Sequence, residues 1–206
     1  MCSCLEFAAH RVTLNDIMSV AHPFIKTTVA AVVAIVMYSI PLNAQTADSQ
    51  DEAGLLAALA VADAAQAQSL DRQLQRLWSR SGSAAMDLLL ERGRESLQAD
   101  EPLVAIEHLT ALTDHAPDFA EGWNVRAMAY FQADLYGPAL SDLRHALALN
   151  PNNYNAIIGL GSILETFGDN ERAYQAYQRA QAIHPHHEDV TKSLERLRSG
   201  IEGKAL

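Results

Sequence analysis

Alanines, leucines and aromatic residues recur with a period of 34 residues between residues 86 and 187, and a proline closes each period. The three prolines are Pro117, Pro151 and Pro185. Within each period the apolar residues follow helical spacing in two successive runs. Proline ends the second run because it lacks an amide hydrogen and disfavours helical geometry in the residue before it. The pattern therefore predicts two antiparallel helices per period and an all-α fold without strands.

Equivalent positions in each period hold the same kinds of residue. Small residues at Gly93, Ala127 and Gly161 fall near the middle of the first helix, where they let the paired helices approach closely. Asp118 and Glu121 have the spacing of a capping box, which would open a helix at this point. The fullest period, residues 120–153, carries in order Trp123, Ala127, Tyr130, Ala139, Leu143, Ala146 and Pro151.

This order of large and small residues resembles the tetratricopeptide repeat family, whose unit is also 34 residues long. The resemblance implies an α-solenoid of antiparallel helix pairs, with repeats at residues 86–119, 120–153 and 154–187. Arg92 and Arg126 depart from the family pattern, because they occupy a position that the family usually fills with leucine. We therefore expect the first repeat either to pack more loosely or to face a polar neighbour.

Two further segments flank the repeats. Residues 188–206 place Val190, Leu194 and Leu197 on one helical face, which predicts a C-terminal capping helix followed by a tail. Residues 45–85 predict a helical pair that does not match the repeat positions. This pair either caps the first repeat, with Trp78 as its anchor, or places part of itself in the binding groove of the same or a neighbouring molecule.

The composition of the N-terminal residues 1–44 predicts a targeting signal. The run Thr27–Leu42 is apolar and uncharged, and it follows Lys26. This is typical of a signal peptide, for which we expect cleavage after Ala44 and a periplasmic or secreted product. Leu42 is large for the position three residues before cleavage, so an uncleaved anchor that leaves the repeats outside the cytoplasm is the alternative. A membrane is a partner only in that second case.

The first residues do not suit the leading region of a signal peptide. Glu6 and Asp16 are acidic, whereas a segment that begins at Met18 carries only the amino terminus and Lys26 as charges. We therefore hypothesise that Met18 is the true start. Both cysteines of the chain also precede Met18, so we expect no disulfide in the exported part.

Charge and candidate chemistry narrow the function further. The formal net charge is −10, which would repel phosphate backbones, so we expect no nucleic-acid partner. The run from His184 to His187 could hold a metal, but a solvated turn is the preferred interpretation because no cysteine lies nearby and only Glu188 and Asp189 are adjacent. We find no nucleophile motif and no phosphate loop. We expect no cofactor, no metal and no enzymatic activity.

In the family that the chain resembles, the first helix of each repeat lines a concave groove that receives peptides or partner helices. The resemblance therefore implies a groove here, and its expected residues are Asp87, Leu90, Arg94, Leu97, Glu121, Asn124, Met128, Phe131, Asn155, Ile158, Ser162 and Glu165.

The composition of these positions indicates what the groove would bind. Leu90 and Arg94 stand where family members that grip a C-terminal carboxylate have lysine and asparagine, so we expect that clamp to be missing. An apolar stripe rimmed by acidic residues would suit an amphipathic segment that carries basic residues. Alternatively, several of these residues contact the next repeat and belong to the core.

The sequence thus predicts an exported, non-enzymatic scaffold or adaptor that binds a protein or peptide in its groove. A membrane-tethered assembly or chaperone-like subunit of an envelope complex is the alternative.

Overall fold

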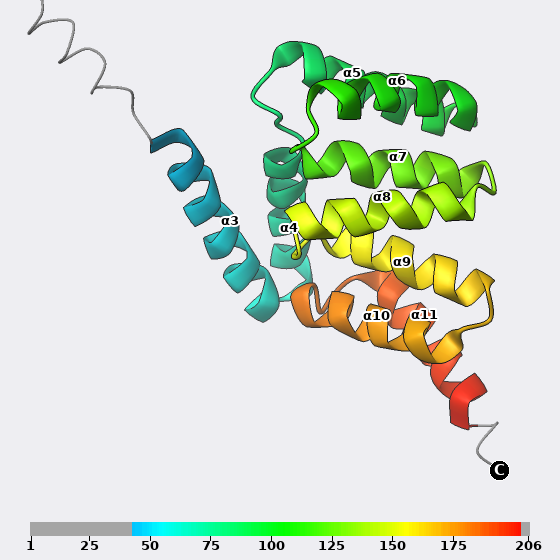
Figure 1. Cartoon of the computed structure of the whole chain (residues 1–206). Coiled ribbons are helices and arrows are strands. Elements are labelled where there is room, and N and C mark those ends of the chain that lie inside the picture. Colours follow the sequence, from blue (N-terminus) through cyan, green and yellow to red (C-terminus); the bar gives the residue numbers. More distant parts are fainter. Residues whose placement is uncertain (1–42, 203–206) are drawn as a thin grey trace, which may run out of the picture. The chain divides into compact units, whose positions relative to one another are not determined.

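The computed structural model describes residues 43–202, which form nine helices and no strand (Figure 1). The predicted all-α fold is confirmed. The helices are α3 (Asn43–Val61), α4 (Ala64–Trp78), α5 (Ala84–Gln98), α6 (Pro102–His115), α7 (Ala120–Gln132), α8 (Tyr136–Leu149), α9 (Tyr154–Thr166), α10 (Asn170–Ile183) and α11 (Glu188–Glu202). The run Thr27–Leu42, Met18 and both cysteines lie outside the described residues. None of the helices within residues 43–202 combines the length and apolar character that crossing a membrane requires.

Helices α5 to α10 pack as three successive pairs, α5 with α6, α7 with α8 and α9 with α10 (Figure 1). Helix α6 packs on α7 and α8 packs on α9, so each pair stacks on the next. A helical array of this kind buries its apolar faces only between neighbouring units. The predicted helical-repeat solenoid is therefore present.

Glycines allow the close approach of the paired helices. A Cβ atom added to Gly93 of α5 would lie 2.5 Å from Cγ of Leu109 in α6. A Cβ atom on Gly161 of α9 would lie 2.8 Å from the Tyr177 ring in α10. Both distances are shorter than van der Waals contact, so only glycine fits unless the partner side chain moves. The small residues that the period singled out thus carry the helix packing.

The predicted capping box at the start of α7 is wrong. The residue that precedes α7 is Phe119, whose side chain makes no capping hydrogen bond, and Glu121 turns into the interior. By contrast, Asn153 and Asp169 cap α9 and α10, where their side chains accept hydrogen bonds from the Ala156 and Arg172 amides at 3.2 Å. Glu121 does not cap the helix because its carboxylate accepts hydrogen bonds from buried side chains, as described below.

Arg126 fills its unusual position with a buried ion pair. Its Nε and Nη2 donate to the two carboxylate oxygens of Asp142 in α8, at 2.6 and 3.0 Å. Its Nη1 donates to Oγ1 of Thr113 in α6 at 2.7 Å, and its guanidinium lies 4.7 Å from the centre of the Trp123 ring. The polar neighbour that the departure from leucine suggested is therefore real, and it ties the first helix pair to the second. Arg92, the other departure, is exposed.

The two helices that precede the array contact its third pair. Leu59 of α3 and Leu74 of α4 are fully buried in one apolar cluster with Tyr154 and Ile157 of α9. The capping interpretation placed Trp78 against the first repeat. Trp78 is an anchor, but its ring lies against Tyr154 of the third pair. The reason is that Tyr154, the first residue of α9, offers an aromatic face that is itself wholly buried.

Helix α11 packs on α10 and closes the array after the third pair. Val190, Leu194 and Leu197 are at most 4% exposed and join the same cluster as Tyr154. Lys192 lies on the outer side, where it pairs with Glu188. The amphipathic capping helix predicted from the sequence is confirmed.

Candidate functional site

A cavity of about 690 Å³ runs along the first helices of the three pairs. Its wall is formed mainly by α5, α7 and α9, while α4 contributes Gln75 and the region of α11 contributes His187 and Asp189. We call this cavity the groove.

The structure brings nine of the twelve groove residues predicted from the sequence to this one cavity. They are Arg94, Leu97, Glu121, Asn124, Met128, Phe131, Asn155, Ile158 and Ser162. Leu90 lies elsewhere, because it is 1% exposed and packs in the core between α5, α6 and α7. Glu165 is held by Arg196 of α11, and Asp87 accepts hydrogen bonds from Ser81. Leu90 thus belongs to the core and Glu165 binds the next helix, as the alternative interpretation allowed for part of the set, whereas Asp87 binds the segment before its own helix.

An accessible apolar wall forms one side of the groove. Met128 is 52% exposed and Phe131 is 36% exposed, although both are large apolar side chains on the same face of α7. Leu97 and Ile158 line the same cavity from α5 and α9. Exposed apolar side chains that converge in a concave site are typical of a surface that binds a partner.

Aromatic rings continue this wall beyond the groove. Phe131 meets the edge of Tyr136 with ring centres 5.6 Å apart, and Tyr136 meets Phe167 in the same way at 5.6 Å. Phe167 is 63% exposed. These contacts fix the orientation of Phe131, because the ring of Tyr136 packs against it.

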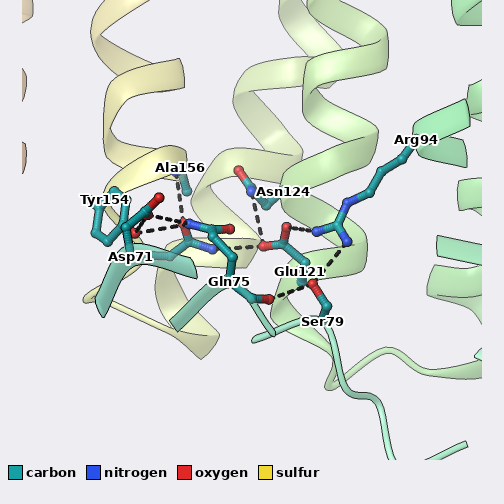
Figure 2. A network of polar contacts seen from close by, with 9 residues as sticks. Asp71, Gln75, Ser79, Arg94, Glu121, Asn124, Tyr154 and Ala156 are labelled. Carbon is teal, nitrogen blue, oxygen red and sulfur yellow. Dashed lines mark hydrogen bonds and ion pairs between the residues drawn. The ribbon is translucent and has the colours of Figure 1, made fainter. Parts of the chain in front are cut away.

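The opposite end of the groove holds a polar network centred on Glu121 (Figure 2). Its Oε1 accepts a hydrogen bond from Nη2 of Arg94 at 2.5 Å. Its Oε2 accepts from the side-chain amides of Asn124 and Asn153, at 3.1 and 3.2 Å. Glu121 is only 3% exposed. Burial raises the pKa of Glu121, while Arg94 and the two amides partly oppose that rise. Glu121 therefore joins three helix pairs and is not a free acid on the groove rim.

Helix α4 closes this end of the groove. Arg94 Nη1 donates to Oγ of Ser79 at 2.9 Å, just after α4 ends. The Tyr154 hydroxyl donates to the Asp71 carboxylate and accepts from Nε2 of Gln75 at 3.0 Å (Figure 2). Burial, followed by the hydrogen bond to Asp71, raises the pKa of Tyr154. The N-terminal pair thus contributes Gln75 to the wall of the groove and leaves the cavity open, so neither of the two arrangements that the sequence left open describes it fully.

The three acidic residues expected on the groove rim are all engaged within the chain. Asp87 binds Ser81, Glu121 binds Arg94, and Glu165 binds Arg196. The charges of Glu121 and Glu165 are therefore compensated by arginines, whereas Asp87 keeps its charge because serine is neutral. The expected preference for a basic partner stays a prediction, with fewer free acids to support it.

The model of the tetratricopeptide repeat matches residues 120–153 and 154–187. The chain is a tetratricopeptide repeat protein. A TPR repeat-containing protein of Rhizobium etli is 27% identical over 141 residues, which cover 68% of this chain and 69% of that protein. A human SGT1 homolog is 28% identical over 102 residues, 45% of this chain and 28% of that protein, so the chain spans under a third of the human protein's length.

Solved structures agree on the fold of this tetratricopeptide repeat protein. The first TPR of Spaghetti (RPAP3), bound to HSP90 peptide SRMEEVD, has a TM-score of 0.56 and 25% identity, with 58% of this chain and 98% of that chain covered. The Sgt2 TPR domain from Aspergillus fumigatus has a TM-score of 0.55 and 23% identity, with 60% and 83% covered. Such a repeat array is a scaffold suited to protein–protein interaction.

The expected solvated turn from His184 to His187 is wrong for its first residue. His184 is 6% exposed because the edge-on ring of Tyr154 covers it, with ring centres 5.2 Å apart. Burial, followed by the nearby His187, lowers the pKa of His184. Within residues 43–202, no group of three or more histidine, cysteine or acidic side chains is placed to hold a metal ion.

Some lining residues of the tetratricopeptide groove could not be named from the sequence. Gln98 and Gln132 lie one period apart, each following a predicted groove residue, so their shared position was a usable signal. Gln75 and His187 had none, because they belong to a helix outside the period and to a turn. Only the folded chain places these two beside the groove.

Proposed function

We propose that this chain is an exported, non-enzymatic scaffold that captures an extended segment of a partner protein in its groove. The observation that carries the proposal is the apolar wall of Met128 and Phe131, which remains accessible inside a cavity of about 690 Å³. Burying two such side chains against a partner supplies the main driving force for association, about 2 kcal/mol for each.

The comparison with solved structures supports a peptide as the kind of partner. The first TPR of Spaghetti (RPAP3), 25% identical to this chain, is bound to the HSP90 peptide SRMEEVD. A groove across three helix pairs is long enough for an extended segment, since each extended residue spans about 3.3 Å. The partner's side chains that enter the groove are chiefly apolar, because Met128 and Phe131 form its accessible wall while Glu121 and Glu165 are paired with arginines of the chain.

Selection from a random nonapeptide library tests the groove directly. The full chain is immobilised, and bound peptides are recovered, sequenced and resynthesised for affinity measurement. Phe131→Glu should weaken binding of the recovered peptides at least tenfold, about 1.4 kcal/mol, because it places a charge on the apolar wall.

Leu103→Glu is the matched control, because Leu103 is also a large exposed apolar residue (65%) but lies on α6, away from the groove. Both variants are first shown to have the wild-type helical content. Recovery of no peptide, or equal effects of the two variants, would refute groove binding.

We also propose that the repeats act outside the cytoplasm. The apolar, uncharged run Thr27–Leu42 behind Lys26 supports this part of the proposal. Fractionation of the native host, combined with N-terminal sequencing, tests it. A soluble envelope form that begins at Gln45 is expected. A membrane-bound form that retains the apolar run would favour a tethered assembly subunit, and an unprocessed cytoplasmic chain would refute export.

A further inference from the structure

Three side-chain amides that line the groove have their orientation fixed by acceptors of the chain itself. Asn124 donates its Nδ2 to the Glu121 carboxylate at 3.1 Å. Gln75 donates its Nε2 to the Tyr154 hydroxyl at 3.0 Å and to Asp71 at 3.4 Å. Gln132 donates its Nε2 to the Asp100 carboxylate at 2.6 Å. An ionised carboxylate only accepts hydrogen bonds, so each amide must turn its nitrogen toward its acid and its oxygen away.

The oxygens of these amides are therefore the atoms left for a ligand. Oδ1 of Asn124 is the clearest case, since Asn124 is 2% exposed and this oxygen has no hydrogen-bond partner among residues 43–202. Figure 2 shows the oxygen on the side of the amide that faces away from Glu121. A buried acceptor without a partner costs about 1–3 kcal/mol, which a ligand that supplies a donor would recover. Asn153 makes the contrast, because its nitrogen also binds Glu121 but its oxygen caps α9.

We propose that the groove selects its occupant by accepting hydrogen bonds: the occupant is an internal, extended segment of a partner whose backbone N–H groups bind Oδ1 of Asn124 and the neighbouring amide oxygens. This inference rests on the proposed function and names the chemistry of its partner. Asn124, Met128 and Phe131 follow one another on a single face of α7. A segment that lies along this face donates an N–H at Asn124 and places an apolar side chain against Met128 and Phe131.

The same arrangement disfavours two other occupants. A C-terminal carboxylate would bring acceptor oxygens against the oxygen of Asn124, and the charge of Arg94 is already paired with Glu121. A lysine or arginine side chain would find the carboxylate of Glu121 already paired with Arg94 in this part of the groove. A neutral backbone N–H meets neither obstacle.

The test uses the nonapeptide library in two forms, one with both ends blocked and one with a free carboxyl end. The tightest recovered peptide is then resynthesised with each backbone nitrogen methylated in turn, which removes one N–H at a time. We expect blocked peptides to be recovered preferentially. We expect methylation of each nitrogen that binds a groove amide to weaken binding to the wild-type chain about tenfold, the value of one well-made hydrogen bond.

Variants of the groove amides identify the acceptor. One methylation removes the peptide N–H that donates to Oδ1 of Asn124. In Asn124→Leu this methylation should weaken binding much less, because the acceptor oxygen is already absent. Gln132→Leu is the second variant; Gln132 is exposed, so its replacement leaves the fold intact, and it should relieve a different methylation position. Circular dichroism confirms that each variant is folded.

The outcomes separate the inference from the function on which it rests. Recovery of no peptide in either form would refute the proposed function together with the inference. Recovered peptides that require Phe131 but tolerate every methylation would overturn the inference alone. Preference for the free carboxyl form, or a strict requirement for lysine or arginine, would also overturn it and would assign the groove to an anionic terminus or a cationic side chain.

Discussion

The rings of Trp78 and Tyr154 lie with their centres 5.2 Å apart and their planes tilted by 57°, and this contact joins α4 to the first residue of α9. Trp78 is also fixed from the other side, since its Nε1 donates to Glu52 of α3 at 2.8 Å. Glu52 in turn accepts from Asn150, which directly follows α8. One tryptophan thus connects both N-terminal helices to the array.

Replacing this tryptophan should release the N-terminal pair. Trp78→Ala removes a side chain that is only 8% exposed, so we expect a loss of about 3 kcal/mol in the free energy of unfolding. Leu77→Ala on the same helix is the control, because Leu77 is only partly buried and should cost under about 1 kcal/mol. Hydrogen exchange should show faster exchange in α3 and α4 for Trp78→Ala, while α7 and α8 stay protected. Equal exchange in both variants would contradict the anchoring role.

Glu121 should be important for stability although the repeat pattern places it in a groove. Glu121→Ala leaves the donors of Asn124, Asn153 and Arg94 without their acceptor, and the first two are almost fully buried. We expect a loss of about 3 kcal/mol, measured by urea denaturation.

Glu121→Gln is the matched variant, because it keeps the shape and one acceptor oxygen but removes the charge. It should lose less stability than the alanine variant, since burial of the charge is itself costly and raises the pKa of Glu121. A cost for Glu121→Gln as large as that for Glu121→Ala would contradict this account.

Acidification should weaken the contact between α9 and the turn that precedes α11. Burial and His187 lower the pKa of His184 from 6.5, while Asp71 of α4 opposes the shift and His186 adds to it. A base whose pKa is lower in the folded state stabilises the fold fully above its unfolded pKa. That stability is lost as the pH falls below 6.5 and through the folded pKa.

Denaturation at about pH 7.5 and about pH 5.5 measures this effect. His184→Phe keeps an aromatic ring against Tyr154 but does not titrate, so its stability should fall less between the two conditions than that of the wild-type chain. An equal fall in both proteins would show that other groups govern the acid response.

The sequence was sufficient for the parts of the molecule that repeat. Gly93 and Gly161 could be assigned to close helix contacts because their period coincides with that of the prolines, and the same period brought nine predicted residues to one groove. Periodicity carries this information because each unit packs only on its neighbours, so equivalent residues meet equivalent surroundings.

Residues outside the period could not be placed in this way. The contact between Trp78 and Tyr154 joins segments 76 positions apart, and no local pattern encodes it. Glu121 was misassigned because its spacing from Asp118 fits a capping box equally well, and only the buried donors around it decide which role it takes. Orientation of the groove amides likewise depends on acids brought near by folding.

Arg126 and Asp142 provide a case in which restoring the family's usual residue should be harmful. Arg126→Leu matches the residue common at this position in tetratricopeptide repeats, yet it leaves the Asp142 side chain, 6% exposed, as a buried charge without its partner. We expect a loss of about 3–5 kcal/mol. Asp142→Ala alone should cost a similar amount, because the guanidinium of Arg126 is then unpaired between α6 and α8.

The double variant Arg126→Leu with Asp142→Ala tests whether the ion pair itself contributes to the free energy of unfolding. Removing both charges eliminates the buried ions together, so the double variant should recover most of the stability that either single change loses. Thr113 is left with one hydrogen bond to the Thr110 carbonyl and needs no new partner. Additive losses in urea denaturation would show instead that Arg126 acts mainly through packing on Trp123 and not through its ion pair.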